Sequence, residues 1–234
     1  MNAPSRLRLR ATLIALSSLF LVPCSLFPQG SLTPPGAPAP TMKTLDQVEA
    51  RTHLAGGSSA LSVGSGSYYL TGNLTISSVQ NGITITASNV TIDLNGFSVT
   101  GPGSGSSAGI FLNGGVSNVT ILNGTIRDWG GFGINALGNP NLRVEKLRVL
   151  SNGNTGITAD ANAAVILCVL DSNVNGGISG LDNCVVKDTQ AIFSTTLGGT
   201  GISLGAAAVV TGCIARGNGG NGIAPGPGSL EHIK

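Results

Sequence analysis

The segments NVTIDLNGFSVTG (residues 89–101) and NVTILNGTIRDWG (residues 118–130) are near-duplicates within one chain of 234 residues. In the first segment, Val90, Ile92 and Leu94 alternate with polar residues, which is the period-two pattern of a β-strand with one buried face. The second segment repeats the pattern. The pair therefore predicts two copies of one structural unit rather than a single active-site loop.

A Gly-Ile pair extends the repeat over most of the chain. Its glycine recurs at intervals of 27, 24, 23, 21, 24 and 21 residues, at positions 82, 109, 133, 156, 177, 201 and 222. Such a period indicates a solenoid. Leucine is too sparse for a leucine-rich repeat, and each period instead contains short β-branched runs separated by Gly and Asn. Three short strands per period predict an all-β parallel β-helix of about seven coils, stacked at roughly 4.8 Å.

Alignment of three coils places Asp93, Leu122 and Glu145 in one outward column. Asp93 and Glu145 are then two coils apart, about 9.6 Å, at the edge of the range for an inverting glycoside hydrolase. Leu122 lies between them, and neither carboxyl has an obvious neighbour that would raise its pKa. A lyase or epimerase could also recruit Arg127 and Arg143 beside Asp128 and Glu145. The candidate catalytic residues are Asp93, Arg127, Asp128, Arg143 and Glu145. A solvated charged face explains the same residues.

Trp129 and Phe132 follow these charges between glycines. They are candidates for an aromatic platform under a sugar ring, and a hydrophobic turn packed on its neighbour is the alternative. Asn73, Asn89, Asn118 and Asn123 each match the glycosylation pattern, but their places at strand starts and turns favour β-helix sequence.

The same alignment predicts an interior column of cysteines, Cys168, Cys184 and Cys213, if the coil containing AIFSTTLGG has a longer turn. Their spacing lacks the clustering of a metal site, so stacked core thiols are favoured over a metal or a disulfide. Five residues further on, the alignment predicts a ladder of turn residues, which are Asn152, Asn173, Thr189 and Asn218.

The amino-terminal part predicts export. Three arginines precede an apolar run over residues 11–22, so residues 1–30 are expected to be a secretory signal peptide, and residues 31–42 a Pro-rich linker. Leu-Val-Pro-Cys resembles a lipobox except for its proline, which leaves lipid attachment at Cys24 as an alternative. The remaining boundaries are an N-terminal cap at 43–66, the β-helix at 67–224 and a C-terminal tail at 225–234.

The composition excludes several functions. Without the three leader arginines, nine basic residues remain against ten acidic ones, and no basic run marks a nucleic-acid partner. No other apolar run approaches the length of a membrane span. The two histidines, His53 and His232, are expected outside the coils, which excludes a Ser-His-Asp triad on them. No metal or cofactor is expected, and calcium is left as an alternative that no recognisable set of ligands supports.

The chain resembles a known family in three blocks and in the Gly-Ile coils. The blocks are LDQVEARTHL (45–54), GSYYLTGNLTI (66–76) and NGITITASNVTIDLNGFSVTG (81–101). They resemble bacterial secreted right-handed parallel β-helix proteins of the pectin-lyase-like superfamily, over roughly residues 43–224. The resemblance implies a right-handed coil. The Asn-Thr-Asp, Asp-Asp, His-Gly and Arg-Ile-Lys motifs of polygalacturonase-like enzymes are missing.

The expected function is therefore a secreted structural or glycan-binding module at the cell envelope, with an extracellular polysaccharide or an envelope component as its partner. One alternative is a polysaccharide lyase, epimerase or glycoside hydrolase acting along the β-helix face. Another is a surface protein that assembles end to end through uncapped coils.

Overall fold

The computed structural model describes residues 50–232, in which every regular element is a β-strand. The strands are β1 (Thr52–Leu54), β2 (Leu61–Val63), β3 (Gly66–Leu70), β4 (Leu74–Thr75), β5 (Ile83–Ile85), β6 (Val90–Asp93), β7 (Ser98–Thr100), β8 (Ile110–Leu112), β9 (Val119–Arg127), β10 (Ile134–Asn135), β11 (Leu142–Leu150), β12 (Thr155–Thr158), β13 (Ala164–Ile166), β14 (Val169–Asp171), β15 (Gly176–Ser179), β16 (Val185–Lys187), β17 (Gln190–Ile192), β18 (Thr200–Ser203), β19 (Val209–Thr211), β20 (Ile214–Arg216), β21 (Ile223–Ala224) and β22 (Leu230–His232).

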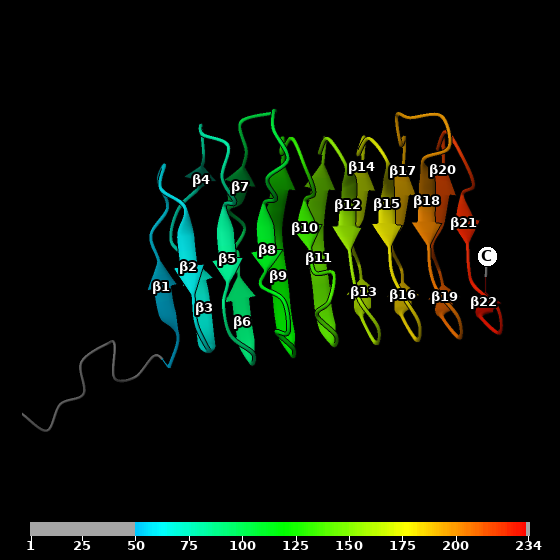
Figure 1. Cartoon of the computed structure of the whole chain (residues 1–234), viewed down its shortest axis with the longest axis horizontal. Helices are drawn as coiled ribbons and strands as arrows, with labels where there is room; N and C mark the ends of the chain where they lie inside the picture. Colours follow the sequence, from blue (N-terminus) through cyan, green and yellow to red (C-terminus); the bar gives the residue numbers. More distant parts are fainter. Residues whose placement is uncertain (1–49, 233–234) are drawn as a thin grey trace, which may run out of the picture. The chain divides into compact units, whose positions relative to one another are not determined.

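The strands form three parallel faces that run along the stack (Figure 1). Face 1 has the order β1-β3-β6-β9-β11-β13-β16-β19-β22, and face 3 has the order β2-β5-β8-β10-β12-β15-β18-β21. Face 2 contains β4, β7, β14, β17 and β20 together with the second halves of β9 and β11. These two nine-residue strands bend from face 1 into face 2. The predicted all-β parallel solenoid of about seven coils is confirmed.

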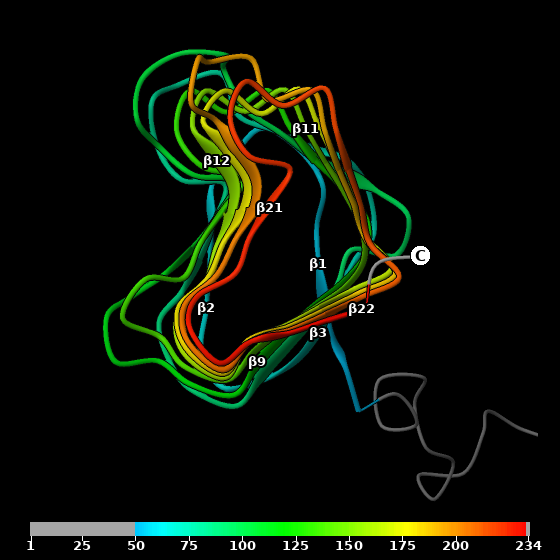
Figure 2. The ribbon, with the colours of Figure 1, turned by 90° about the vertical axis from the view of Figure 1, so that its right-hand side faces the viewer.

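The core lies inside the superposed coils, which Figure 2 shows from the end of the stack, and it consists of inward columns of side chains. Each column contains one apolar side chain per coil, because every strand pairs in register with its equivalents in the adjacent coils. On face 1 the column is Ile92, Ile121, Val144, Val165, Val186 and Val210. On face 3 it is the isoleucines of the Gly-Ile pairs, from Ile83 to Ile223. The predicted alternation of inward and outward residues is therefore confirmed.

The glycine of each Gly-Ile pair is required by the distance between coils. A Cβ atom added to Gly133 would lie 2.5 Å from the carbonyl oxygen of Gly156 and 2.5 Å from Cγ1 of Val149. The same approach to the next glycine carbonyl recurs down the column, at Gly82, Gly109, Gly156, Gly177 and Gly201. The repeat seen in the sequence is therefore a column of positions without room for a side chain.

The corners between faces use the left-handed backbone conformation in coil after coil. Before face 1, the corner residue is asparagine with φ between 56° and 62° at Asn89, Asn118, Asn141, Asn162 and Asn183. Asparagine adopts this conformation more easily than most residues. Between faces 1 and 2 the same conformation occurs at Leu167, with φ 55°, and at Lys146, with φ 54°. The geometry of the stack overrides the residue preference there.

The solenoid extends beyond the predicted boundaries at both ends. Strands β1 and β2 lie within the predicted cap at 43–66, yet they pair directly with β3 and β5. Strand β22 lies within the predicted tail at 225–234 and pairs with β19. The predicted signal peptide, linker and lipobox, and residues 43–49 of the predicted cap, lie outside the described residues. His53 and His232 are also within strands, contrary to the expectation that they flank the coils.

Replacement of Gly133 by alanine should lower the free energy of unfolding by about 1–3 kcal/mol, because the new methyl group overlaps the next coil. Gly114→Ala is the matched control, since a Cβ atom there meets nothing within 4 Å, and its effect should stay within about 0.5 kcal/mol. Urea unfolding followed by circular dichroism measures both values. Equal midpoints for the two variants would contradict the packing explanation.

Candidate functional site

The outward column of face 1 contains Asp93, Leu122 and Glu145 in consecutive coils, as predicted. The carboxylate of Asp93 is held by structural donors. Its Oδ1 accepts hydrogen bonds from the backbone N–H of Asn95 at 2.8 Å and from Nδ2 of Asn123 at 3.2 Å. Its Oδ2 lies 3.5 Å from Nη1 of Arg51. Asp93 therefore fixes the turn after β6 and ties it to the next coil.

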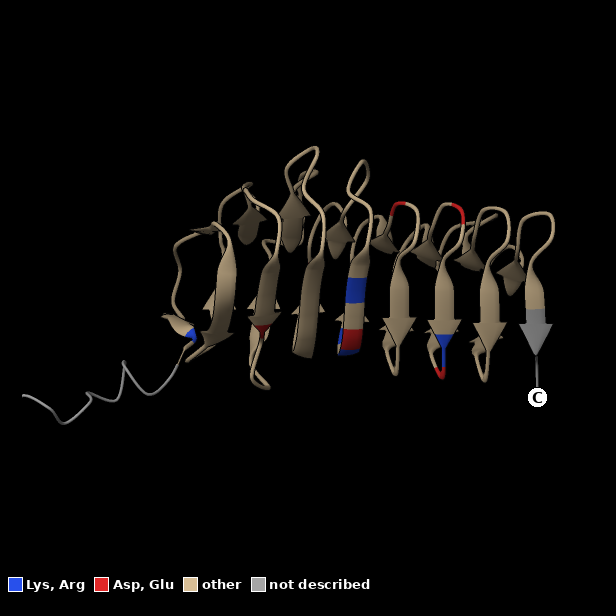
Figure 3. Ribbon diagram, turned by 90° about the horizontal axis from the view of Figure 1, so that it is seen from below, with Lys and Arg blue, Asp and Glu red and all other residues tan. Residues whose placement is uncertain are grey.

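Glu145 has different partners. Nη2 of Arg143 lies 2.8 Å from its Oε2, and Nζ of Lys146 lies 3.5 Å from its Oε1. The hydrogen bond from Arg143 is the main cause that lowers the pKa of Glu145. Figure 3 shows these charges together on β11, near the middle of a sparsely charged face. A general acid needs a raised pKa, so Glu145 is poorly suited to that role.

The other two catalytic candidates lie on a different face. Arg127 points outward at the end of β9 on face 2, and Asp128 occupies the following left-handed corner with φ 59°. Nε of Arg127 lies 3.5 Å from Oδ2 of Asp128, and both side chains are substantially exposed. The five candidates are thus divided between two faces of the solenoid. The geometry favours exposed ion pairs over one catalytic centre.

Trp129 lies in the core, which corrects the prediction of an aromatic platform. Its side chain is 1% exposed, and its Nε1 donates a hydrogen bond to the carbonyl oxygen of Val99 at 3.2 Å. The ring occupies space left by the glycines of neighbouring coils, at Gly82, Gly101 and Gly109. Phe132 is only partly exposed in the following loop. The alternative prediction, a hydrophobic turn packed on its neighbour, fits Trp129.

The interior column of cysteines differs from the prediction. Cys168 and Cys213 share a column, but the residue between them is Thr189, whose Oγ1 accepts a hydrogen bond from the backbone N–H of Cys168 at 3.3 Å. Cys184 belongs to another column, between Ala163 and Ala208. The coil that contains Cys184 and Thr189 has its longer turn after Thr189. Counting backward from Gly201 therefore placed Cys184 in the column where Thr189 lies.

All three cysteines are free and buried. Burial raises the pKa of the Cys168 thiol to about 11, so this thiol stays protonated at neutral pH. Burial also raises the pKa of Cys184 and of Cys213. In the described residues, no group of three or more His, Cys, Asp and Glu side chains could hold a metal ion. The thiols therefore act as small core side chains.

The turn ladder contains Ser194 where Thr189 was predicted. Its members are Asn152, Asn173, Ser194 and Asn218. Nδ2 of Asn152 donates a hydrogen bond to Oδ1 of Asn173 at 2.8 Å, and both amides are almost completely buried. Nδ2 of Asn173 donates to the carbonyl oxygen of Val149 at 2.9 Å. These amides satisfy buried backbone groups between coils, so they are structural.

The outward side of face 3 was not identified from the sequence. Its strands present one column that contains no charge, namely Thr84, Phe111, Asn135, Thr158, Ser179 and Ser203, of which Thr158 is buried at 5% exposure. We call this column the face 3 strip. Phe111 and Asn135 are half-buried, and Oγ1 of Thr158 donates a hydrogen bond to the carbonyl oxygen of Ile134 at 3.2 Å. In Figure 2, loops project at both ends of face 3.

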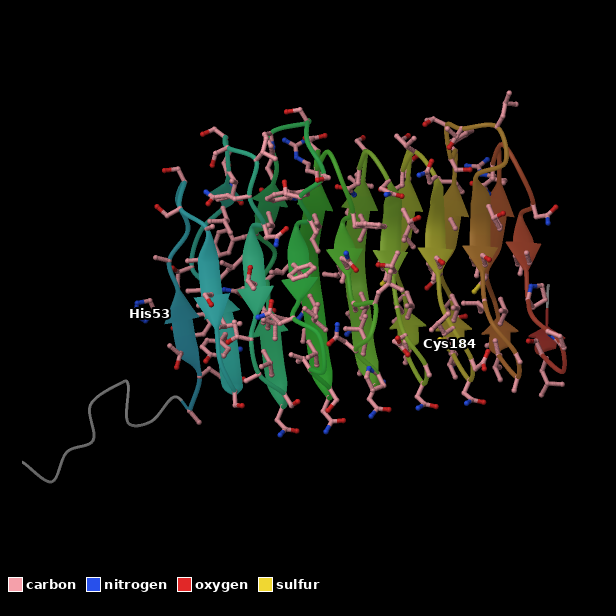
Figure 4. All side chains as sticks on the ribbon, viewed as in Figure 1. His53 and Cys184 are labelled. Carbon is pink, nitrogen blue, oxygen red and sulfur yellow. The ribbon has the colours of Figure 1, made fainter. Side chains whose placement is uncertain are left out.

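Charged residues make up only 9% of the sequence, and Figure 4 shows the side chains of the described residues on the coils. His53 projects from β1 at one end of the stack, and Cys184 lies several coils away from it. No helix in the described part of the chain is long and apolar enough to cross a membrane. The outward surface of the described coils offers hydroxyl, amide and guanidinium groups together with the paired carboxylates of Asp93, Asp128 and Glu145.

Stacked parallel strands, inward columns and left-handed corners define a β-solenoid. The family model described as right-handed β-helix region matches residues 59–229, so the chain belongs to this family. Together with the coils, this match supports the predicted pectin-lyase-like β-helix repeat protein. No curated protein and no solved structure matches the chain.

Asp93→Ala should destabilise the protein by about 0.5–1.5 kcal/mol, because the N–H of Asn95 and the amide of Asn123 lose their acceptor. Asp93→Asn retains an acceptor oxygen at this position and should cost less than the alanine variant. Thermal unfolding of the two variants checks this order. If the asparagine variant loses as much stability as the alanine variant, the charge pair with Arg51 dominates instead.

Arg143→Gln should raise the pKa of Glu145 toward its ordinary value of 4.5, because the largest cause of the lowered pKa is removed. The folded pKa is depressed, so the stabilisation from this pair is present above the unfolded value and is lost as the pH falls through the folded value. Carbon NMR of the side-chain carboxyl measures the shift. Lys146→Gln is the control and should have a smaller effect. A pKa unchanged by Arg143→Gln would contradict the assignment.

Proposed function

We propose that this protein is a secreted, non-catalytic module of the cell envelope that binds an uncharged polysaccharide along the face 3 strip. The observation that carries the proposal is the composition of this strip: accessible hydroxyl and amide side chains at Thr84, Asn135, Ser179 and Ser203, with Phe111 among them and no charged residue. Sugar rings offer the matching chemistry, since they have apolar ring faces and many hydroxyl groups.

The repeat gives the strip its length. Equivalent side chains follow each other at roughly 4.8 Å along the stack, so an extended glycan lying parallel to the axis passes Thr84, Phe111 and Asn135 in successive coils and Ser179 and Ser203 further on, with the buried Thr158 between the two groups. Phe111 is the one aromatic side chain in the strip and is the candidate for stacking under a sugar ring. Thr84 and Asn135 occupy the same column in the adjacent coils. They are the nearest candidates for hydrogen bonds to the same glycan.

The enzyme alternative has less support. Asp93 and Glu145 share a column, but each carboxylate is engaged by its own partners and the pKa of Glu145 is lowered. Arg127 and Asp128 lie on face 2. A hydrolase needs two carboxyl groups that act on one bond. The described residues offer two separated anchoring carboxylates instead.

Phe111→Ala should weaken binding to a neutral polysaccharide about tenfold, the equivalent of about 1.4 kcal/mol. Isothermal titration against soluble neutral glucans, mannans and xylans measures it. Phe193→Ala is the matched control, because this exposed phenylalanine lies at the corner after β17, away from the strip, and it should change affinity less than twofold.

Absence of binding to every neutral glycan, or equal affinity of the Phe111→Ala variant, would overturn the proposal. The same mixtures are followed for unsaturated products at about 235 nm and for new reducing ends, which report lyase and hydrolase chemistry. Release of either product would favour the enzyme alternative.

A further inference from the structure

The outward side of face 2 presents a compact set of hydrogen-bond donors where β7, β9 and β11 pair. Ser98, Thr125 and Arg148 form one outward column, and Thr100 and Arg127 belong to the neighbouring column. The inward residues between them are buried, with Val99, Ile126 and Val149 all at 0% exposure. Alternation along the strands therefore directs the five polar side chains to the surface. We call them the face 2 patch.

The side chains of this patch are largely unused by the fold. Within the described residues, Arg148 forms no ion pair and no hydrogen bond, and the same holds for the hydroxyl groups of Ser98, Thr100 and Thr125. Arg127 lies 3.5 Å from Asp128, in a pair that is half exposed. Such a pair in water is worth little and leaves the guanidinium available. Apart from Arg127, the side-chain donors of the patch therefore have no acceptor within the described residues.

Acidic side chains near the patch are few. Asp128 follows Arg127 at the corner. Asp171 lies in the outward column of Thr100 and Arg127, two coils beyond Arg127. The carboxylate of Asp171 accepts a hydrogen bond from the hydroxyl group of Ser172 at 2.8 Å and forms no ion pair with Arg148. The two guanidinium groups thus have two carboxylates nearby, but within the described residues only Arg127 is paired, with Asp128, and the charge of Arg148 has no partner.

We propose that the face 2 patch binds sulfate-ester groups of an acidic polysaccharide. The backbones of Arg127 and Arg148 are roughly 8 Å apart, from one coil step and a two-residue offset, so both long side chains reach an oxyanion between them. Guanidinium groups bind oxyanions through paired hydrogen bonds, and the hydroxyls of Thr125 and Thr100 supply further donors. A sulfate ester has three free oxygens to accept them.

This site is independent of the proposed function, because it lies on a different face from Phe111 and takes a ligand of opposite character. The face 3 strip contains no charge and suits a neutral glycan, whereas the face 2 patch requires an anion. One site can therefore fail without the other. Binding to the patch should also weaken as salt rises, since the charges are exposed.

The test uses the protein with dextran sulfate, a polyuronate and neutral dextran, by isothermal titration at low and high salt. Arg148→Gln should weaken dextran sulfate binding about tenfold. The double variant, which carries Arg127→Gln as well, should bind dextran sulfate more weakly still. Arg143→Gln is the matched control, because this arginine is paired with Glu145 on face 1, and it should change affinity less than twofold. Circular dichroism verifies that each variant is folded.

Three results would overturn the proposal. The first is no binding of dextran sulfate, and the second is equal loss in the Arg148→Gln and Arg143→Gln variants, which would indicate a diffuse charge effect. The third is polyuronate binding as tight as that of dextran sulfate, which would remove the assignment of sulfate as the group recognised. Loss of dextran sulfate binding in Arg148→Gln with neutral glycan binding retained would support two separate sites.

Discussion

The stack depends on the close contact between glycines of adjacent coils. At the Gly-Ile pairs from Gly82 to Gly201, the place of a side chain is occupied by the carbonyl oxygen of the next glycine, as at Gly133 and Gly156. The missing side chain lets the backbones come near enough for hydrogen bonds such as the one from the Ile83 N–H to the Gly109 carbonyl oxygen, and the isoleucine that follows then falls in the same inward column. A bulkier residue at one coil would separate it from its neighbour, so the constraint recurs in every coil.

A core built of columns leaves the outward residues free to differ between faces. Face 1 carries the ion pairs of β11, face 2 carries unengaged guanidinium and hydroxyl groups, and face 3 carries a strip without charge. Because each face is flat and parallel to the axis, a change of side chain alters the surface without altering the fold. Binding functions can therefore lie side by side on one scaffold.

Several polar residues that suggest chemistry are used by the scaffold itself. Asp93 accepts hydrogen bonds from a turn and from the next coil, and Asn152 and Asn173 satisfy buried backbone groups. Buried or turn-forming polar groups need such partners, since an unsatisfied group is costly. This use removes Asp93 from the position of an isolated catalytic carboxylate.

The amino-acid sequence by itself determined the period, the parallel solenoid and the inward or outward direction of most strand residues. These follow from contacts one repeat apart, which a single sequence displays as self-similarity. Only the tertiary structure decided the column of Cys184 and Thr189, because the turn over residues 195–199 changes the coil length locally. It also decided that Trp129 is buried, since the space for its ring comes from Gly82 and Gly109 in other coils. Such contacts depend on which coils meet, and composition and spacing do not record that.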